Sequence, residues 1–484
     1  MEREHIRMKA FGNGIDRRVR LALTETEVWR GIMPAWQDFY RRLWEEGTFI
    51  ELCRQGLLVA SEAVAQIDGT EGVLQFRQPR LPFVAYPFEW SAAMFRAAAE
   101  KCLDLHEALW DQDLCLTDSH PWNLVFRGSD PQWVDLTSIT AYDAGTVEAG
   151  LRQFRSCFLH PLTLLNEGQG EIARALLTHP FADVSDGHAD SILSSGEWRS
   201  LPWFRRIPRA LLAAQAKPGR ILGREWRKYA CFGRVDFHAK AAAHQVARRL
   251  RRELAAIRPR GDPNEWTTYV QAGQADLSAK EISERRIDER RLENTKLRIL
   301  DKWLATLKAE SRTLLDLGCN KGLFTQMAWL QGYEAAGVDT DHGAIDCMYQ
   351  VSRAGCLPVH CAVNDFVAPR EAAGMLTNPL PTFAERFQAD VILAFAVVHH
   401  LYFGRYLMDF ERIVQLLGLY ARKYLIVEFV PPGDGFLRGH YAGAAKATEY
   451  TSENFRQAVE RLFRVLEIGS SFPSGRTIWV LQKL

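Results

Sequence analysis

The sequence predicts an α/β protein whose carboxyl-terminal part is a mostly parallel sheet with helices on both faces. Three observations support this prediction. The chain has 484 residues, which is too many for one ordinary domain. Its composition, 47% hydrophobic and 25% charged residues, is typical of a globular protein with a sizeable core. From Thr313 onward short apolar runs alternate with helical stretches, and this alternation is typical of parallel sheets.

The amino-acid composition changes at two places along the sequence, and these changes suggest the domain boundaries. Pro259, Gly261 and Pro263 interrupt the helical pattern near residue 260. The stretch that follows, 281–300, mixes acidic and basic residues as an exposed helix does. We therefore expect one domain at 1–258, a helical linker at 259–300 and a second domain at 301–484.

Apolar runs of strand length are expected to form the sheet of the second domain. In an open sheet of this kind ligands bind beyond the carboxyl ends of the strands. The residues that follow each strand are therefore the candidates for a site. The expected strands are 313–318, 334–339, 357–363, 390–398, 423–430, 463–469 and 477–484.

The densest motif, D-x-G-x-x-x-G, runs from Asp316 to Gly322 at the end of the first strand. Gly318 and Gly322 let the backbone approach a ligand closely, because a side chain there would block it. The helix that follows offers free N–H groups to a carboxylate at its start. Together with Asp316 and the turn residues Cys319 and Asn320, these glycines are the first group of ligand-binding candidates.

Two further groups of candidates follow the second and third strands. Asp339, with Thr340 beside it, ends the second strand, where a carboxylate can accept both hydroxyls of a ribose. Asn364, Asp365 and Phe366 follow the third strand, where a carboxylate would meet an adenine amino group. A dinucleotide-binding domain is the main alternative, but it would require G-x-G-x-x-G instead of the G-x-x-x-G spacing present here.

These three groups together resemble the class I S-adenosylmethionine-dependent methyltransferases. The resemblance covers about residues 296–484 and implies a Rossmann-like sheet that ends in an antiparallel pair of strands. It implies S-adenosylmethionine as the cofactor, with the first motif at the methionine moiety, the strand-two acid at the ribose and the next acid at the adenine. Asn320 departs from the pattern, because many members have a glycine there, so the shape of this loop is not carried over.

The segment after the fourth strand should face the transferred methyl group. It contains Ala396, His399 and His400, and we expect His399 to lie nearest the methyl group. An oxygen acceptor gains from a base that removes its proton, and an imidazole with an unperturbed pKa of about 6.5 suits that task. His399 is thus a base or a structural residue, while packing beside Leu401 is the simpler interpretation of His400. Glu428, after the fifth strand, is a substrate contact or a structural carboxylate.

The amino-terminal domain contains a D-x-x-x-x-N motif from Asp118 to Asn123, followed by Asp135 on an apolar run. This spacing resembles the catalytic and metal-binding loops of protein kinases and aminoglycoside phosphotransferases. The resemblance implies a kinase-like α+β domain with Asp118 as the base and with Asn123 and Asp135 as magnesium ligands. It also places residues 83–90 where a kinase hinge would contact adenine. A loop that uses these residues only for capping is the alternative.

The kinase-like pattern is incomplete. No lysine occurs between Lys9 and Lys101, so the phosphate-holding lysine is missing, and no glycine-rich loop precedes it. Arg77 and Arg80 are the candidate replacements, although a planar guanidinium is not equivalent to an ammonium group. We therefore expect a pseudokinase whose three polar residues are the remnant of a nucleotide and metal site, without ATP turnover.

Several stretches of both halves resemble a bacterial group of two-part methyltransferases, the NoeA-like, nodulation-type group. They are YPFEW, DSHPWNLVF, QWVDLTSI, RQFRSCFLHPL, the EW-x-x-Y of the linker, DLGCNKG and VVHHL. This resemblance implies a methyltransferase that acts on a small-molecule or carbohydrate (glycan) acceptor, and we expect O-methylation. The alternatives are a bifunctional kinase-methyltransferase and an amino-terminal half that binds the substrate or a carrier.

The remaining features argue against several other classes of protein. No apolar run approaches the roughly 18 residues of a membrane span, and the start lacks the apolar stretch of a signal peptide, so a cytoplasmic protein is expected. The nine cysteines form no C-x-x-C pair and no cluster with histidines, so no metal site is expected. Basic and acidic residues balance at 60 and 59, and the arginine-rich stretch at 205–260 is interpreted as a solvated helix face instead of a nucleic-acid surface.

Overall fold

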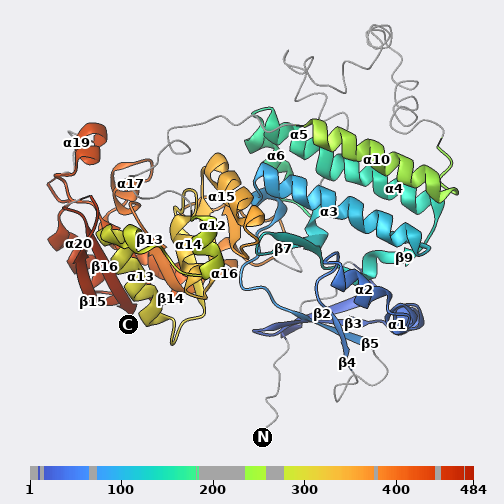
Figure 1. Ribbon diagram of the computed structural model, residues 1–484, viewed down its shortest axis with the longest axis horizontal. Helices are drawn as coiled ribbons and strands as arrows, with labels where there is room; N and C mark the ends of the chain where they lie inside the picture. The colour runs from blue at the N-terminus through green and yellow to red at the C-terminus, as the bar shows by residue number, and fades with distance from the viewer. Residues whose placement is uncertain are drawn as a thin grey trace, which may run out of the picture.

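The computed structural model describes residues 9–10, 16–64, 74–180, 183–184, 235–257, 277–374, 380–441, 448–473 and 475–484. Two parts lie next to each other along the long axis of the molecule, residues up to 257 in one and residues from 277 in the other (Figure 1). Within the described residues, we find no helix with both the length and the apolar character needed to cross a membrane.

The amino-terminal part begins with a five-stranded antiparallel sheet. Its strands, in the order β1-β2-β3-β5-β4, are β1 (Lys9–Ala10), β2 (Val19–Leu23), β3 (Glu27–Ile32), β5 (Leu74–Pro79) and β4 (Glu62–Val64). The helices α1 (Gln37–Glu45) and α2 (Thr48–Arg54) pack on this sheet through Trp44 and Phe49, whose rings contact that of Phe76. The sheet and its helices form the small lobe of the kinase-like α+β arrangement that the sequence predicts.

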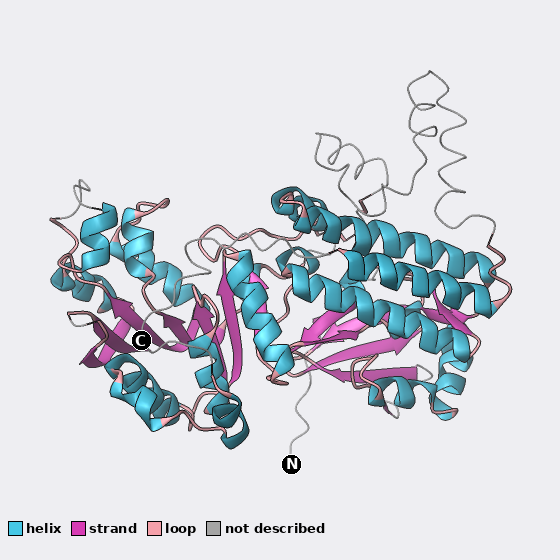
Figure 2. Ribbon diagram, turned by 45° about the horizontal axis from the view of Figure 1, so that its top comes forward, coloured by secondary structure: helices cyan, strands magenta, loops and turns pink. Residues whose placement is uncertain are grey.

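A helical layer with short strands follows this sheet, and its long helices run alongside one another in Figure 2. The longest of them, α3 (Ala92–Asp111), begins where the Ser91 hydroxyl accepts a hydrogen bond from the backbone N–H of Met94. The other elements are η1 (Pro34–Trp36), η2 (Pro87–Glu89), β6 (Leu114–Leu116), η3 (Pro121–Asn123), β7 (Leu124–Arg127), β8 (Asp130–Trp133), η4 (Leu136–Ser138), β9 (Ile139–Ala141), α4 (Ala144–Phe154), η5 (Arg155–Leu159), α5 (His160–Asn166), α6 (Gly170–Leu177) and α10 (Lys240–Ala256).

Helix α10 carries the part of the arginine-rich stretch that the structure describes; residues 205–234 and 258–260 lie outside the described residues. Arg251 pairs with Asp104 and Glu107 of α3, at 2.6 and 2.5 Å. Arg249 pairs with Glu253 on its own helix at 3.0 Å. These two arginines are therefore engaged within the protein, and Arg251 ties α10 to α3.

The carboxyl-terminal part is built on a seven-stranded sheet in which all the expected strands are present. In spatial order they are β12 (His360–Val363), β11 (Glu334–Asp339), β10 (Thr313–Leu317), β13 (Ala389–Ala394), β14 (Ala421–Phe429), β16 (Thr477–Lys483) and β15 (Phe463–Ser470). The first five strands are parallel, while β16 lies antiparallel between β14 and β15. The predicted Rossmann-like sheet with a closing antiparallel pair is thus confirmed.

Helices cover both faces of this sheet (Figure 2). They are α14 (Leu323–Leu330), α15 (His342–Ala354), α16 (Phe383–Arg386), α17 (Val398–Phe403), α18 (Phe410–Tyr420), α19 (Gly435–Tyr441) and α20 (Ser452–Val459). The fourth strand was expected to run to Val398, but β13 ends at Ala394 and Val398 already begins α17. Ala396 adopts a left-handed φ of 53° in between, which is incompatible with a continuing strand.

The expected exposed helix at 281–300 is wrong. The stretch contains part of α12 (Ala279–Glu284), then η9 (Glu289–Glu293), and only at α13 (Thr295–Leu307) a long helix. Leu297, Leu300 and Leu304 of α13 are fully buried, so this helix belongs to the carboxyl-terminal core and crosses the expected boundary at residue 300. The many charges before Thr295 concealed this apolar spacing of three and four residues.

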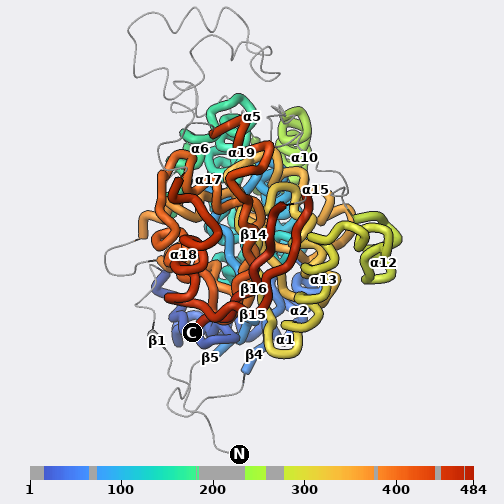
Figure 3. Tube along the Cα trace, turned by 90° about the vertical axis from the view of Figure 1, so that its left-hand side faces the viewer, coloured from blue at the N-terminus to red at the C-terminus, as the bar shows by residue number. Residues whose placement is uncertain are grey.

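The two parts share one continuous cluster of buried apolar side chains. Helix α15 packs against α3, and the ring of Tyr349 lies 5.8 Å from that of Phe126. The rings of Phe83 and Phe387 are also 5.8 Å apart. Figure 3 looks along this arrangement from the end where β15 forms the edge of the sheet, with β16 beside it.

Candidate functional site

A cavity of about 560 Å³ opens at the carboxyl ends of the parallel strands, where an open α/β sheet binds its ligands. Its wall is formed by the turn after β10, the end of β11, the loop after β12 and the segment after β13. The lining residues are Lys296, Gly318, Cys319, Asn320, Lys321, Gly322, Leu323, Phe324, Asp339, Thr340, Asp341, Asp365, Phe366, Val367, Phe395, Ala396, Val397, His399, His400, Leu401, Gly404, Arg405, Tyr406, Phe436, Tyr441 and Arg476. The predicted site residues of this part therefore gather at one place, with three exceptions described below.

The glycines of the first motif are required by the backbone and by close packing. Gly318 and Gly322 have φ values of 73° and 81°, which favour glycine. A Cβ atom on Gly322 would approach the sulfur of Met348 to 2.5 Å, and one on Gly318 would approach Val397 to 2.8 Å. Asn320 has a φ of 49°, a conformation that asparagine tolerates better than most residues. Asparagine therefore satisfies the conformation for which glycine is usual at this position.

Asp339 ties the first two loops of the cavity together. One of its carboxylate oxygens accepts a hydrogen bond from the backbone N–H of Asn320 at 2.8 Å, and the other accepts from that of Asp341 at 2.9 Å. Burial raises the pKa of Asp339 above its ordinary value. Each oxygen retains a lone pair, so this carboxylate is able to accept two neighbouring hydroxyl groups from a ligand in the cavity.

Asp365 also lines the cavity, in the loop that follows β12. Its carboxylate accepts hydrogen bonds from the backbone N–H of Val367, at 2.9 Å, and from the hydroxyl of Tyr406. Phe366 follows it in the wall and offers an aromatic face. A carboxylate beside an aromatic ring is suited to an adenine, which needs an acceptor for its amino group and an apolar contact for its ring.

Asp316 and Asn364 do not line the cavity. Neither side chain is therefore positioned for the direct ligand contact that the sequence predicted. Asp316 is 1% exposed and accepts a hydrogen bond from the hydroxyl of Thr325, and burial raises its pKa to about 7. The Asn364 side chain points away from the cavity and donates to Glu89 of the amino-terminal part. Both residues support the loops from behind, because their side chains find buried partners on the far side of the backbone.

His399 lies in the first turn of α17, in the wall of the cavity, and is 2% exposed. Its Nδ1 atom is buried without a hydrogen-bond partner among the described residues. Burial lowers its pKa to about 2, and the nearby charges of His400, Arg476 and Lys296 act in the same direction. The expected unperturbed pKa is therefore wrong, since the cavity holds a neutral imidazole whose protonated form would be a buried cation.

His400 has a different setting from its neighbour. Its Nδ1 atom lies 3.3 Å from the hydroxyl of Tyr441, and its ring packs on that of Phe436 with centroids 5.6 Å apart. Burial lowers its pKa to about 4, with His440 adding to the effect. These contacts agree with the packing interpretation of His400.

Glu428 is the third predicted residue that does not line the cavity. It is fully buried, and its carboxylate lies 2.9 Å from the ammonium group of Lys296 and 2.5 Å from the hydroxyl of Ser471. Its position supports the structural interpretation over a substrate contact. The cavity-facing partner is Lys296, which is 1% exposed and whose pKa burial lowers while Glu428 opposes that shift.

Sequence reasoning missed the two buried cations of the cavity, Lys296 and Arg476. Lys296 stands at the start of α13, where an exposed linker was expected, and Arg476 lies just before β16 and pairs with Asp434 at 2.8 Å. The apolar spacing of Leu297, Leu300 and Leu304 was the available signal, because it places residue 296 on the buried side of a helix. Nothing in the local sequence distinguishes Arg476 from a surface arginine.

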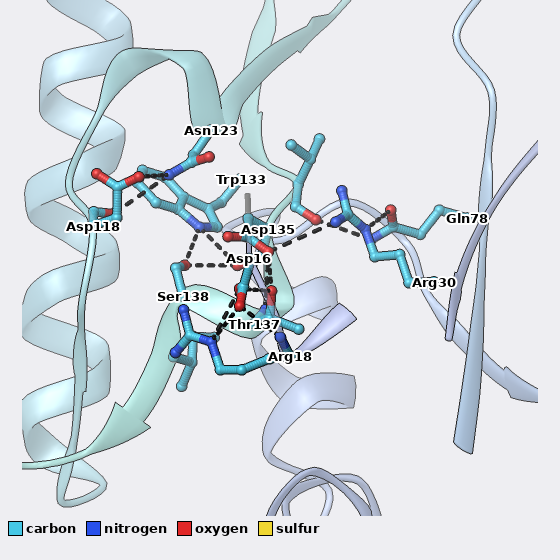
Figure 4. Close-up of polar contacts among 12 residues, drawn as sticks. Asp16, Arg18, Arg30, Gln78, Asp118, Asn123, Trp133, Asp135, Thr137 and Ser138 are labelled. Atoms are coloured by element: carbon cyan, nitrogen blue, oxygen red, sulfur yellow. Dashed lines mark hydrogen bonds and ion pairs between the residues drawn. The ribbon is translucent and has the colours of Figure 1, made fainter. Parts of the chain in front are cut away.

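The kinase-like motif also gathers its residues, as Figure 4 shows. The Asn123 amide donates to the Asp118 carboxylate at 3.1 Å, and the Gln153 amide donates to the same carboxylate at 2.6 Å. Asp135 accepts from the backbone N–H and the hydroxyl of Thr137 at the start of η4. The capping alternative describes Asp135 well, because its side chain closes the N-terminus of that short helix.

Arg30, on β3, takes the place that was assigned to Arg77 or Arg80. Its guanidinium is buried, lies 3.7 Å from the Asp135 carboxylate and donates to Gln78 at 2.9 Å (Figure 4). Arg77 instead pairs with Glu62 at the surface, and the exposed Arg80 donates to a backbone carbonyl of Thr24. The prediction of Arg77 or Arg80 is wrong because the inward-facing positions of the two paired strands could not be told apart by sequence alone.

In the parts of the chain that the structure describes, no group of three or more histidine, cysteine, aspartate or glutamate side chains is arranged to bind a metal ion. The eight described cysteines are free thiols.

No protein-family model matches this sequence. The chain is similar to nodulation protein NoeA of Rhizobium meliloti (strain 1021), with 28% identity over 415 residues, which are 84% of this chain and 81% of that protein. The resemblance to the NoeA-like group is thereby confirmed.

Three solved structures are similar to parts of this one. Magnesium protoporphyrin IX methyltransferase (ChlM) from Synechocystis PCC 6803, with bound SAH, is 16% identical with a TM-score of 0.29, covering 39% of this chain and 82% of that chain. The N-methyltransferase NodS from Bradyrhizobium japonicum WM9 is 16% identical with a TM-score of 0.28, covering 40% and 98%. The bifunctional kinase-methyltransferase WbdD is 15% identical with a TM-score of 0.30, covering 44% of each chain.

Proposed function

We propose that this protein is an S-adenosylmethionine-dependent methyltransferase with its donor site in the cavity of the carboxyl-terminal part. The observation that carries the proposal is the pairing of Asp339 with the backbone of Asn320 at the ends of two adjacent parallel strands. This pairing sets a ribose-binding carboxylate beside a glycine turn with room for the methionine moiety. The site therefore fits the donor by shape and by the polar groups it presents.

The donor supplies an electrophilic methyl group, and the residues of this chain orient the acceptor toward it. We assign Gly318, Cys319, Asn320 and Gly322 to the methionine moiety, and Asp339 with Thr340 to the ribose. We assign Asp365 and Phe366 to the adenine, and Ala396 and His399 to the region of the transferred group. Most of the rate enhancement then comes from holding the two reactants in line.

We propose that neutral His399 accepts the proton that the acceptor oxygen loses, as the new C–O bond forms and the C–S bond of the donor breaks. Because its pKa is low, the imidazole then releases this proton to water. Methylation gives the acceptor oxygen positive charge and makes its proton strongly acidic, so a weakly basic imidazole is sufficient. A low pKa also keeps the imidazole unprotonated at every physiological pH. The acceptor is a small molecule or a carbohydrate, in line with the resemblance to the NoeA-like group.

The donor assignment is tested by calorimetry with S-adenosylmethionine. The wild-type protein should bind it with micromolar affinity, and Asp339→Ala should weaken binding by about 2–3 kcal/mol, because buried hydrogen-bond acceptors are lost. Glu334→Ala is the matched control, since Glu334 begins the same strand and pairs with Arg312 at the surface. Absence of binding by the wild-type protein would refute the proposal.

The acceptor is best sought by metabolite analysis of a strain that lacks this protein. Compounds that are lighter by one methyl group than those of the parent strain are the expected acceptors. Each is then supplied to the purified protein with labelled donor, and only a true acceptor should take up the label.

We propose that the amino-terminal part is a kinase-like scaffold without phosphotransfer activity. The observation that favours this is the Arg30–Asp135 ion pair, which occupies the carboxylate that a magnesium ion would need. Asp118 is likewise engaged by Asn123 and Gln153, so the expected base already has two donors. A bifunctional kinase-methyltransferase would need Asp135 to exchange its contact with Arg30 for a magnesium ion.

A further inference from the structure

The segment between β5 and α3, at the place of a kinase hinge, contacts the carboxyl-terminal part through a fully buried carboxylate. Both oxygens of Glu89 accept hydrogen bonds from the guanidinium of Arg386, each at 2.7 Å. Arg386 also donates to the backbone carbonyl of Val84 and lies 3.7 Å from the centre of the Tyr86 ring. A bidentate pair with both side chains buried fixes the relative position of these two segments.

Glu89 also reaches the loop that follows β12. Besides a hydrogen bond from the backbone N–H of Tyr86 at 2.7 Å, it accepts one at 2.8 Å from the side-chain amide of Asn364. The carbonyl oxygen of that same amide accepts from the backbone N–H groups of Asp365 and Arg370, at 2.9 and 3.0 Å. Asn364 therefore closes the loop 364–370 around its own side chain, and Glu89 holds that side chain in place. Asp365, at the start of this loop, lines the cavity.

A second contact reaches the loop that follows β11. Arg174 of α6 is buried, and its guanidinium donates to the backbone carbonyls of Phe88 and Trp90. The same guanidinium lies 2.9 Å from Nδ1 of His342. His342 begins α15 directly after Thr340 and Asp341, which line the cavity.

A third contact joins two helices at this junction. The Asp346 carboxylate of α15 accepts a hydrogen bond from the backbone N–H of Ala93, in the first turn of α3, at 2.7 Å. A carboxylate is stabilised at the N-terminus of a helix by its free N–H groups. Residues 84–93 and α6 therefore support both loops of the nucleoside half of the cavity, at the junction of the two parts in Figure 1.

We propose that the amino-terminal part completes the methyl-donor site, and that Glu89 and Arg174 are positioning residues for the loops that bind adenine and ribose. This inference rests on the proposed function, since it concerns the same donor. Ordering a free loop costs about 1–2 kcal/mol of conformational free energy per residue. These contacts hold the loops in order before the ligand binds, so the ligand does not have to order them. A loop that adopts the binding conformation only a tenth of the time raises the apparent Kd tenfold.

The test measures the Kd for S-adenosylhomocysteine by calorimetry, at a temperature well below the melting temperature of each full-length variant. Glu89→Gln keeps the size of the side chain but removes the charge that pairs with Arg386, and it should raise the Kd about tenfold. His342→Ala is the milder variant, because His342 is partly exposed, and it should raise the Kd about threefold. If Glu89→Gln leaves the buried Arg386 without its partner and the protein does not fold, His342→Ala still tests the inference.

Tyr349→Phe is the matched control at the same junction. The Tyr349 hydroxyl donates to the backbone carbonyl of Ser129, so its removal weakens the junction without touching either loop. This variant should melt at a lower temperature but bind S-adenosylhomocysteine within twofold of the wild type. A merely structural role for Glu89 predicts that its variant behaves in the same way.

A double variant tells whether Glu89 acts through the loop. The double variant Glu89→Gln, Asn364→Ala should bind S-adenosylhomocysteine no more weakly than the single variant with the higher Kd, because both changes release the same loop. Folded Glu89→Gln and His342→Ala proteins that bind within twofold of the wild type would overturn this inference. A wild-type protein that does not bind at all would instead refute the donor assignment itself.

Discussion

His399 contributes to the site through its position and its neutral state. It sits at the start of α17 beside the left-handed Ala396, so the chain turns sharply as it leaves β13 and brings the ring into the cavity wall. Because burial lowers its pKa to about 2, protonation of this ring does not shape the pH dependence of the reaction above pH 4. In the proposed reaction this neutral ring accepts the proton of the acceptor.

For this single residue, we expect His399→Ala to lower turnover by about a hundredfold. The affinity for S-adenosylmethionine should stay unchanged, because proton acceptance acts only in the transition state. The pH profile of the wild-type enzyme between pH 5 and 8 should show no inflection that this variant removes. His400→Ala is the control and should retain turnover within a few-fold. Unchanged turnover in His399→Ala would make that histidine structural.

At the scale of elements, the short helix η4 and strand β3 decide what the kinase-like motif can do. The Asp135 carboxylate caps η4 and also pairs with the buried guanidinium of Arg30, so it already has two partners within the protein. We expect the wild-type protein to show no magnesium-dependent binding of ATP by calorimetry. Asp135→Ala should lower the free energy of unfolding by about 3 kcal/mol, because it leaves a buried cation without its partner.

Asp130→Ala is the matched control, since Asp130 pairs with Lys101 near the surface and its loss should change stability by less than about 1 kcal/mol. ATP binding that depends on magnesium and disappears in Asp135→Ala would restore the bifunctional reading of the chain.

The elements of the carboxyl-terminal part were predictable because each strand is a continuous apolar run bounded by polar turns. Glycine turns and strand-end acids also follow from local chemistry, so the sequence could single out Gly318, Gly322, Asp339 and Asp365, all of which line the cavity. Arg30 and Lys296 were not found, because burial of a cation depends on which distant carboxylate lies opposite it. That pairing is a property of strand register and helix packing, which short motifs do not encode.

At the scale of the whole molecule, buried neutral histidines make stability depend on pH. Burial lowers the pKa of four histidines in the folded protein to between about 2 and about 4. They are His106, His360, His399 and His400. In the unfolded chain these groups take up protons below a pH of about 6.5, whereas in the folded protein they do not. Acidification therefore favours the unfolded state. Asp316, Asp339 and Glu371 have the opposite sign, since burial raises the pKa of each carboxyl group, but they are fewer than the four histidines.

We expect the melting temperature to fall between pH 7 and pH 5. His360→Phe should reduce the loss of unfolding free energy over this interval by about 2 kcal/mol, because it removes one group that the unfolded chain protonates. His360 suits the test, since burial is the cause of its shift and its ring already packs against Phe83. The exposed His238, replaced in the same way, is the control. A wild-type protein equally stable at both pH values would contradict this account.

The sequence by itself determined the sheet, its closing antiparallel pair, the glycine turn and the acids of the proposed donor site, because these depend on hydrophobic periodicity and on residues adjacent in the chain. The tertiary structure alone decided that Asn364 faces Glu89, that Lys296 joins the cavity, and that the hinge-like segment supports the loops after β11 and β12. These contacts join residues more than a hundred positions apart, and those of Asn364 and His342 exist only once both parts have folded against each other.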